Sequence, residues 1–267
     1  MGIINVTPDS FADGGEFFHF DQALAQARAL AAAGADLLDI GGESTRPFAD
    51  PVPLDEELRR TIPLIRAVRA EIPLPISIDT YKAPVAQAAL EAGAHIINDI
   101  SALRFDPHMV HLVRETRAPV ILMHMQGTPR DMQTNPRYAD LLGEIKAFLD
   151  ERLRFALENG LSQDRIVLDP GIGFGKTFAH NLEILNNLEV FLDLGCPLLV
   201  GPSRKAFLGH LLGGLPPPQR DVGTLAALAL AALKGASILR VHNVAFARQF
   251  FQVFHAIRRA TPASAPG

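Results

Sequence analysis

The sequence has little cysteine, no long apolar run and only a small net charge, and each feature excludes a class of protein. One cysteine among 267 residues, Cys196, excludes a disulfide framework and a cysteine zinc cluster, so we expect a buried thiol and the reducing cytoplasm. No run of about 18 apolar residues occurs and residues 1–10 lack a charged region, so neither a membrane helix nor a signal peptide is predicted. A net charge of −4 and a pI of about 6.1 argue against nucleic-acid and membrane-surface binding.

The stretch DPGIGFGKT, residues 169–177, looks like a phosphate-binding loop but has the wrong spacing. A P-loop requires a glycine five positions before the glycine of its Gly-Lys-Thr, and that position is Pro170, which has no N–H to offer a phosphate. The glycines at 171, 173 and 175 also fail the dinucleotide pattern G-x-G-x-x-G. We therefore predict no nucleotide binding here, expect Lys176 to be dispensable for ligand binding, and seek another use for Asp169.

A short apolar segment, a polar loop and a helical segment recur along the chain, with helical periodicity clear over residues 21–34 and 54–71. Strands are predicted at residues 2–6, 36–40, 75–79, 95–99, 119–124, 165–169, 197–201 and 237–242. Eight near-continuous apolar strands, each followed by a helix, favour an α/β protein with a single-domain (β/α)8 TIM barrel over a doubly wound open sheet. We predict that the barrel spans residues 1–258 and that residues 259–267 form a disordered tail.

Every predicted strand ends in polar side chains. They are Asn5, residues 43–46, Asp79, Asn98 with Asp99, His124, Asp169, residues 203–205, and Arg240 with His242. Active sites in such barrels lie at the carboxyl ends of the strands. One polar residue is expected at any loop, but a polar group at all eight strand ends predicts a shared ligand site.

Four of these strand ends suit a flat nitrogen heterocycle. Asp79, Asn98 and Asp169 offer carboxylate and amide oxygens, which accept hydrogen bonds from amino and ring N–H groups. A 2-amino-4-oxo pteridine carries such groups, and Lys205 would supply a donor near its ring oxygen or nitrogen. The sequence therefore suggests a pterin-like ligand.

A second cluster suits an anion. Asn5, Arg240 and His242 end the first and last strands, which are neighbours in a closed barrel. Asn5 is also a candidate oxygen ligand for Mg²⁺. A heterocycle pocket beside an anion-holding edge suggests a substrate with a diphosphate leaving group.

Eight motifs, in order along nearly the whole chain, closely resemble those of dihydropteroate synthases. They are INVTPDSFADGG (4–15), DIGGESTRP (39–47), IDTYK (78–82), IINDIS (96–101), MHMQGTPRDMQTNPRY (123–138), LDPGIGFGKT (168–177), GPSRKAFLG (201–209) and LRVHN (239–243). The family condenses 6-hydroxymethyl-7,8-dihydropterin diphosphate with 4-aminobenzoate, giving 7,8-dihydropteroate and diphosphate. The resemblance therefore implies a transferase of folate biosynthesis, with small-molecule substrates and a homodimeric assembly.

The resemblance also implies a role for each matching residue. The pterin would be held by Asp79, Asn98, Met123, Asp169, Phe174 and Lys205. The 4-aminobenzoate would be framed by Phe11, Thr45, Pro47, Phe174 and Ser203. The diphosphate would be held by Asn5, Arg46, Arg240 and His242, with Mg²⁺ on Asn5. Loops 7–15 and 44–53 would close over the site when the diphosphate is bound.

These residue types suit a dissociative mechanism, in which Asp79, Lys205 and Asn5 take the catalytic roles. Loss of diphosphate leaves a cation delocalised into the dihydropterin, which Asp79 would stabilise by Coulomb attraction. Mg²⁺ and the diphosphate-binding residues would stabilise the leaving charge. The aniline nitrogen then attacks once it is held in line, and no covalent nucleophile is needed.

Simpler explanations exist for several of these residues. Asp79 and Asp169 follow strands and precede helices, where aspartate often caps the helix N-terminus. Arg46 is also explained as a solvated side chain, and His124 as a histidine packed between two methionines. Arg204 is expected to face outward in an ion pair.

The sequence departs from the family pattern in three places. Phe48 stands where the family typically has glycine, so a Cβ and a ring restrict that loop beside the aminobenzoate side. Asn243 stands where aspartate is common. The family usually carries a hairpin before the first strand, so we expect either a missing segment or another closure of the amino end, with consequences for stability more than for chemistry.

Two alternatives belong to other functional classes. A corrinoid methyltransferase-like domain shares the barrel and the pterin-binding Asp, Asn and Asp, but generally lacks the counterparts of Lys205, Arg240 and His242. A non-catalytic pterin-binding paralogue would be expected to have lost diphosphate-binding residues, and all of those named above are present. Diphosphate release that depends on 4-aminobenzoate discriminates among the three.

Overall fold

The computed structural model of the chain describes the backbone of residues 1–6 and 16–260, and the side chains of residues 1–6 and 20–260. Its strands are β1 (Gly2–Asn5), β2 (Leu38–Gly41), β3 (Ile76–Asp79), β4 (Ile96–Asp99), β5 (Val120–Met123), β6 (Ile166–Asp169), β7 (Leu199–Val200) and β8 (Ile238–Leu239). Its α-helices are α1 (Glu16–Ala32), α2 (Leu54–Glu71), α3 (Ala83–Glu91), α4 (Met109–Thr116), α5 (Leu141–Glu158), α6 (Phe178–Asn186), α7 (Ala206–Leu211), α8 (Asp221–Leu233) and α9 (Val244–Arg259). Short 3-10 helices are η2 (Gln163–Arg165), η3 (Leu188–Leu194) and η4 (Pro217–Gln219).

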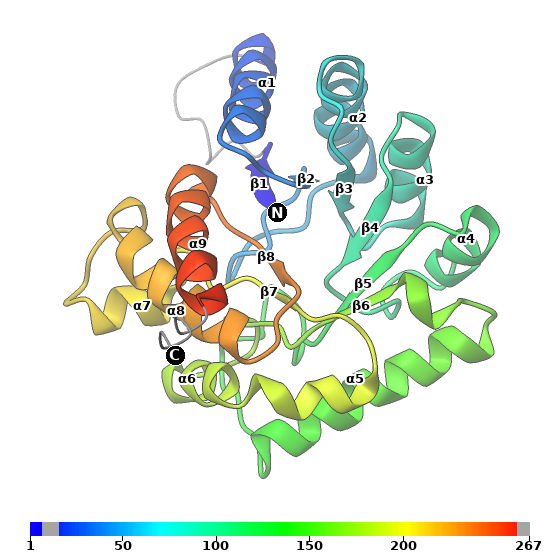
Figure 1. The fold of residues 1–267 in the computed structure, drawn as a ribbon. Helices are drawn as coiled ribbons and strands as arrows, with labels where there is room; N and C mark the ends of the chain where they lie inside the picture. The colour runs from blue at the N-terminus through cyan, green and yellow to red at the C-terminus, as the bar shows by residue number, and fades with distance from the viewer. Residues whose placement is uncertain (7–15, 261–267) are drawn as a thin grey trace, which may run out of the picture.

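The strands form a closed parallel barrel. Strands β1 to β6 pair in sequence order in one parallel sheet, and β7 pairs with β8. Single bridges join the two sheets, from Leu168 to Leu198 on one side and from Gly2 to Val241 on the other. Figure 1 shows the helices arranged around these strands. The predicted (β/α)8 barrel is therefore confirmed, and each predicted strand has its counterpart.

Along each strand, successive side chains point alternately toward the surrounding helices and toward the barrel interior. On β3, Ile76 and Ile78 are fully buried in the large core that includes Leu64 and Val68 of α2. Between them, Ser77 donates its hydroxyl hydrogen bond to a strand neighbour inside the barrel. This period of two is the geometry of a strand whose two faces meet different surroundings.

Helix α2 illustrates how the local sequence defines an outer helix. Acidic residues 55–57 occupy its first turn, where they interact favourably with the helix dipole. Its inner face repeats apolar residues at Leu64, Ile65 and Val68, and the helix ends before Ile72, which is extended. The predicted span of 54–71 is confirmed.

The lower half of the barrel interior, at the amino ends of the strands, is apolar. Met1, Leu37, Ile121 and Leu199 form a buried cluster there, with Ile96, Val167 and Ile238 packed against it. The polar side chains at the strand ends lie toward the opposite, carboxyl end of the barrel.

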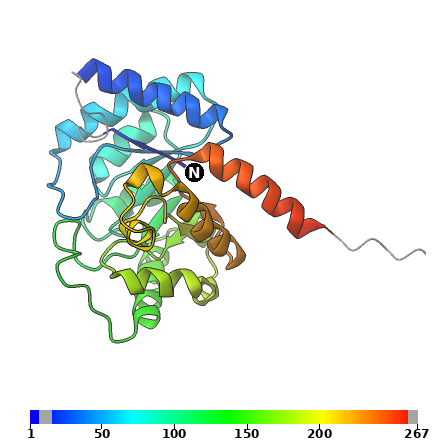
Figure 2. The ribbon, with the colours of Figure 1, turned by 90° about the vertical axis from the view of Figure 1, so that its left-hand side faces the viewer.

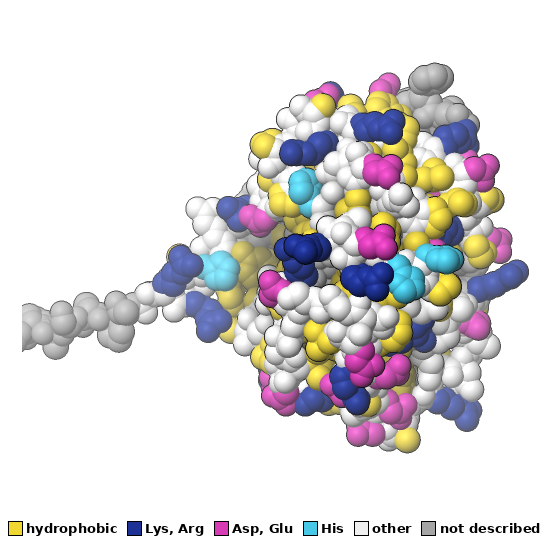
Figure 3. All heavy atoms as spheres, turned by 90° about the vertical axis from the view of Figure 1, so that its right-hand side faces the viewer, with side chains coloured by type: hydrophobic (Ala, Val, Ile, Leu, Met, Phe, Trp, Pro, Cys, Tyr) yellow, Lys and Arg dark blue, Asp and Glu magenta, His cyan; other side chains and the backbone are white. Residues whose placement is uncertain are grey.

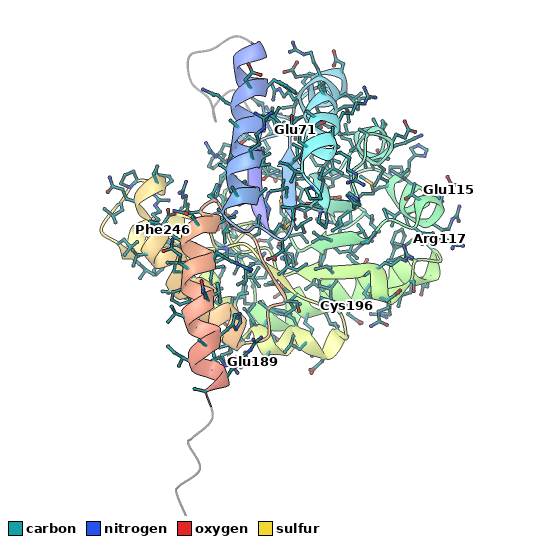
Figure 4. The ribbon with its side chains drawn as sticks, turned by 45° about the horizontal axis from the view of Figure 1, so that its top comes forward. Glu71, Glu115, Arg117, Glu189, Cys196 and Phe246 are labelled. Carbon is teal, nitrogen blue, oxygen red and sulfur yellow. The ribbon has the colours of Figure 1, made fainter. Side chains whose placement is uncertain are left out.

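The surface and the chain ends agree with several sequence expectations. Both signs of charge are interspersed on the face that Figure 3 shows. Cys196, labelled in Figure 4, is free and buried, as predicted. Among the described helices, none is long and apolar enough to cross a membrane. Helix α9 continues to Arg259, one residue past the predicted end of the barrel, and residues 261–267 lie outside the described residues.

Candidate active site at the carboxyl end of the barrel

Strand register brings the predicted pterin residues together. Asp79 of β3 pairs with Asn98 of β4, and Met123 of β5 pairs with Asp169 of β6. All four residues follow their strands to the same end of the barrel, because the strands are parallel. Asn98, Met123 and Asp169 are each at most 7% exposed, so a ligand that reaches them is desolvated.

An ion-pair cluster lies between the two predicted half-sites. Arg240 donates from Nε to Asp39 Oδ2 at 2.6 Å and from Nη2 to Asp79 Oδ2 at 2.8 Å. Burial raises the pKa of Asp79 to about 7; the charges of Arg240 and Lys205 oppose this rise, and that of Asp39 adds to it. The cluster therefore holds a carboxyl group that titrates near neutral pH.

The other predicted pterin-binding carboxyl group has a tight local partner. Asp169 Oδ1 accepts a hydrogen bond from the backbone N–H of Gly171 at 2.7 Å. Burial raises its pKa to about 6, although this hydrogen bond and the charge of Lys176 oppose the rise. Neither Asp79 nor Asp169 caps a helix: Lys82 stands at the N-cap of α3, and Thr177 caps α6. The simpler explanation of these two aspartates as helix caps is wrong.

Lys205 and Phe174 lie together. The Lys205 Nζ atom stands 4.1 Å from the centroid of the Phe174 ring, in a cation–π contact. Burial and the charge of Arg240 lower the pKa of Lys205 to about 8. Between them Gly173 has a φ of +82°, and a Cβ there would lie 2.9 Å from Lys205 Cδ, so the close approach requires glycine.

Lys176 is a buried group with structural contacts, and its dispensability for ligand binding stays a prediction. It is 1% exposed, and its Nζ donates to His124 Nδ1 at 2.8 Å, to the His124 carbonyl at 3.2 Å and to the Phe174 carbonyl at 2.9 Å. Three acceptors surround this amine, and burial lowers the pKa of Lys176 well below its ordinary value. Burial lowers the pKa of His124 to about 2, so its ring is neutral and Nδ1 can accept. Lys176 therefore ties the end of β5 to the loop after β6.

An apolar cluster covers one side of the site. Met123 and Phe174 pack with Ile100, Met125 and Met132, and Tyr81 and Phe105 lie against them. Both of the predicted apolar pterin contacts thus belong to one buried group beside Asp169. Flat apolar walls around a few polar groups are typical of small-molecule sites.

Ser203, predicted to bind 4-aminobenzoate, and His242, predicted to bind diphosphate, are within hydrogen-bonding distance of each other. Ser203 Oγ lies 2.9 Å from His242 Nδ1 and accepts from the His242 backbone N–H at 3.1 Å. Burial and then the charge of Arg240 lower the pKa of His242 to about 3, so the ring is neutral without a ligand. The aminobenzoate and diphosphate sides therefore meet at this pair.

Arg204 is partly buried and is engaged in an ion pair with α8. It forms a bidentate pair with Asp221, at 2.8 and 3.0 Å, which agrees with the expected ion pair. Asn243 completes this arrangement, since its Nδ2 donates to Asp221 and its Oδ1 caps α9 through Phe246 N–H. Both polar atoms of the Asn243 side chain therefore form hydrogen bonds, at a position where the family pattern has aspartate.

The loop after β2 carries the remaining predicted aminobenzoate residues. Thr45 is half-buried, whereas Arg46 and Pro47 are exposed, so Arg46 stands apart from the buried cluster around Arg240. Phe48 has a φ of +64° and is 65% exposed, which is a glycine-type conformation held by a side chain that packs poorly. Phe11 and loop 7–15 lie outside the described residues.

A buried ion network that the sequence analysis missed anchors this loop. Lys82 Nζ contacts Glu43 Oε2 at 2.5 Å, Glu57 Oε2 at 2.6 Å and the Val52 carbonyl at 2.6 Å. The Tyr81 hydroxyl donates to Glu43 Oε1 at 2.6 Å. The network thereby fixes both ends of the segment that holds Thr45 and Pro47.

Asn5 ends β1 beside Gly41 of β2 and is half-buried. Within the described residues, no group of three or more His, Cys, Asp and Glu side chains is arranged to hold a metal ion. A complete protein-made metal cage is therefore not formed by this part of the chain.

Asp39 was also missed by the sequence analysis, which considered only strand ends. The signal was present in DLLDI, residues 36–40, where an aspartate stands inside an otherwise apolar strand. Asp39 is fully buried and contacts Ser77, Asn98 and Arg240. A buried carboxylate with such partners belongs to the site.

A (β/α)8 barrel with buried carboxylates, an amide and two cations at the carboxyl ends of its strands defines a TIM-barrel protein whose candidate site lies at that end, as in enzymes of this fold. Comparison with known proteins agrees, since the pterin binding enzyme family matches residues 1–242. The dihydropteroate synthase of Synechocystis is 48% identical over 97% of this chain and 90% of its own length.

Solved structures give the same result. The Xanthomonas albilineans dihydropteroate synthase with 4-aminobenzoic acid has a TM-score of 0.92 and 47% identity, over 97% of this chain and 93% of that one. A complex of the Xanthomonas albilineans enzyme with 7,8-dihydropteroate has a TM-score of 0.89 and 45% identity over the same shares. The chain belongs to the dihydropteroate synthase family of pterin-binding enzymes.

Proposed function

We propose that this protein is a dihydropteroate synthase, which condenses 6-hydroxymethyl-7,8-dihydropterin diphosphate with 4-aminobenzoate to give 7,8-dihydropteroate and diphosphate. The observation that carries the proposal is the ion-pair cluster in which Arg240 contacts Asp79. It joins a carboxylate suited to a pterin to a cation suited to a diphosphate, within one buried site. Relatives solved with 4-aminobenzoic acid and with 7,8-dihydropteroate support the same activity.

The pterin half uses acceptors on adjacent strands. Asp169 would accept from the amino and ring N–H groups, while Asn98 and Asp79 would pair with the remaining polar edge. Lys205 would donate to the ring oxygen or nitrogen, and it already contacts Phe174, a predicted pterin neighbour. Met123 would pack against the ring as part of the apolar cluster.

The diphosphate half uses Asn5, Arg240 and His242, with Arg46 reaching from the exposed loop. The donor set fits Mg²⁺, because this ion keeps several waters and is usually held by one or two protein oxygens together with substrate phosphates. Asn5 supplies such an oxygen, and no protein-made cage is required for that mode of binding. When bound, the ion would neutralise charge on the leaving diphosphate.

The remaining steps fall to side chains of the chain itself. Arg240 and a neutral His242 would donate to diphosphate oxygens as the carbon–oxygen bond breaks. Asp79 would stabilise the pterin cation in a site from which water is largely excluded. Thr45, Pro47, Phe11, Phe174 and Ser203 would hold the 4-aminobenzoate so that its nitrogen attacks in line.

The test is diphosphate release from the dihydropterin diphosphate, measured with and without 4-aminobenzoate. We expect release to depend on 4-aminobenzoate and to yield 7,8-dihydropteroate in equal amount. Pterin binding without any release would instead indicate a non-catalytic paralogue. Methyl transfer to a corrinoid would indicate the methyltransferase class, which Lys205, Arg240 and His242 argue against.

We also propose a homodimer in the cytoplasm. Leu225 of α8 and Phe246, Phe250, Val253 and Ile257 of α9 line an apolar groove of about 500 Å³, together with Gln249 and Phe254. Helix α9 extends beyond the barrel in Figure 2, and Figure 4 marks Phe246 on it. Val253 and Ile257 are 60% and 70% exposed, a large apolar surface for one chain in water.

Analytical ultracentrifugation tests the assembly. We expect a dimer for the wild type and a monomer for Val253→Glu, because a charge in the centre of an apolar interface is costly to desolvate. Glu189→Lys, at an exposed site outside this groove, is the matched control and should remain a dimer. A monomeric wild type at micromolar concentration would contradict the proposed dimer.

A further inference from the structure

One buried carboxylate, that of Asp39, contacts a residue from each half of the proposed site, Arg240 and Asn98. Asp39 is fully buried on β2, so it has no surface on which a substrate could rest. Its Oδ1 accepts from Ser77 Oγ at 2.5 Å, and its Oδ2 accepts from Arg240 Nε at 2.6 Å. The Asn98 Nδ2 atom lies 3.4 Å from both oxygens.

We infer that Asp39 is a positioning residue that fixes the guanidinium of Arg240 and the side-chain amide of Asn98 for the proposed reaction. The inference rests on the proposed function for the roles of those two residues. The contacts themselves are independent of it.

The effect on Arg240 follows from the geometry of a guanidinium. Its planar group presents donors in a fixed fork, so binding Nε to Asp39 sets the direction of the terminal nitrogens. Nη2 then contacts Asp79, which is 10% exposed at the mouth. Without the carboxylate of Asp39, Arg240 would keep Asp79 as its one anionic contact in the cluster and would turn toward it.

The effect on Asn98 follows from hydrogen-bond polarity. A carboxylate only accepts, so it attracts the NH₂ end of the amide and repels the oxygen end. Asp39 thus sets the orientation in which Asn98 Oδ1 remains free to accept from a ligand. Asn98 is 5% exposed, so its neighbours in the barrel determine its orientation.

A third consequence is electrostatic. Burial is the main cause of the raised pKa of Asp79, and the negative charges of Asp39 and Glu57 add to it, while Arg240 and Lys205 oppose it. Removing the charge of Asp39 therefore lowers the pKa of Asp79. The acidic limb of the pH–turnover profile should move to lower pH, which a purely structural role would not produce.

The test uses Asp39→Asn, which keeps the shape and removes the charge. We expect pterin affinity, measured by calorimetry with 6-hydroxymethylpterin, to fall about tenfold or more, because charge-assisted hydrogen bonds orient Asn98 and Arg240. Turnover should fall by a similar factor, with its acidic limb at lower pH. Asp99→Asn is the control: Asp99 is as buried, but it bonds Ser101 and Leu103 and should change stability while leaving affinity within about twofold.

A double-mutant cycle with Arg240→Gln distinguishes the positioning of Arg240 from a general structural effect of the substitution. Because Asp39 acts partly through Arg240, Asp39→Asn should lower the turnover of Arg240→Gln by a smaller factor than it lowers that of the wild type, and the remaining loss reports its effect through Asn98. It should also raise the melting temperature of Arg240→Gln, because it removes a buried carboxylate that has lost its cation.

Each arm has an outcome that overturns the inference. Additive losses of turnover would show that Asp39 does not position Arg240, and wild-type pterin affinity in Asp39→Asn would show that it positions neither group. The melting-temperature cycle needs no substrate, so additivity there would overturn the anchor even for a protein without synthase activity. Absence of 4-aminobenzoate-dependent release from the wild type, with a coupled melting-temperature cycle, would instead overturn only the proposed function.

Discussion

The lower and upper layers of the barrel interior differ in chemistry although they lie on the same faces of the same strands. A step of two residues leads from Leu37, just before β2, to Asp39 on β2, and from Val167 to Asp169 on β6. The same step leads from Ile238 to Arg240 at the end of β8. The lower layer is packed by apolar groups, whereas the upper layer also holds Asp79 and Asp169, whose pKa values burial raises.

This difference teaches how the fold divides stability from function. Apolar burial in the lower layer stabilises the barrel, at roughly 25 cal/mol for each Å² removed from water. The upper layer opposes folding, because carboxylates are desolvated with incomplete compensation. Stability and activity commonly oppose each other at a functional site in this way.

The largest effect is expected from breaking the lower layer. Ile121→Asp places an unpaired charge at a fully buried position that other apolar side chains surround. We expect a loss of about 4 kcal/mol or more in the free energy of unfolding, or failure to fold. Urea denaturation measures the free energy of unfolding. The control is Ile121→Val, for which we expect a loss of about 1 kcal/mol. A mild loss in Ile121→Asp would mean that this layer is accessible to water.

The next effect concerns charge in the upper layer during turnover. Asp79→Asn should lower the turnover number by about 10²–10³ while weakening pterin binding much less, because the full charge matters when the cation develops. Steady-state kinetics and calorimetric pterin titration measure the two quantities. Unchanged turnover would contradict the cation-stabilising role of Asp79.

Pterin binding should depend chiefly on Asp169. Asp169→Ala leaves the pterin N–H donors unpaired in a buried site, at a cost of about 1–3 kcal/mol or more in binding free energy. Lys176→Met should instead act on stability, since it removes three hydrogen bonds from a buried group and loosens the loop that carries Phe174. Titration with a pterin and with ATP, together with melting curves, separates these effects. Tight ATP binding that Lys176→Met abolished would restore the nucleotide-loop hypothesis.

The same carboxylate makes stability depend on pH. Because the folded-state pKa of Asp169 is raised to about 6, the native state retains a proton that the unfolded chain has lost, so this group lowers stability as pH rises from about 4 to 6. Asp169→Asn should therefore gain about 3 kcal/mol relative to wild type at pH 7.5 compared with pH 3.5, since a shift of one pKa unit corresponds to about 1.4 kcal/mol. Melting temperatures at both pH values test this. A difference that does not change with pH would contradict the raised pKa.

The smallest effect concerns the rim above the upper layer. Phe48→Gly should stabilise the protein by about 1 kcal/mol relative to Phe48→Ala, because both remove the exposed ring and only glycine adopts a φ of +64° without strain. Thermal unfolding of both variants measures the difference. Equal stability would indicate that the loop is not held in this conformation.

The sequence alone determined the barrel and most of the candidate site. Strands and helices alternate with clear periodicities, and polar residues at strand ends must converge in a parallel barrel, so Asp79, Asn98, Asp169, Lys205 and Arg240 could be assigned to one region. The spacing around Pro170 likewise excluded a P-loop from the chain itself.

Only the tertiary structure decided which side chains act on one another. Asp39 and Arg240 are 201 positions apart in the sequence, and their contact exists because β8 closes onto β1 beside β2. The sequence places Lys176 after a glycine-rich loop whether that loop binds a nucleotide or a pterin. Its burial against His124 depends on how β5 and β6 pack. Local pattern specifies which elements form, whereas desolvation and ion pairing depend on the neighbours that chain closure supplies.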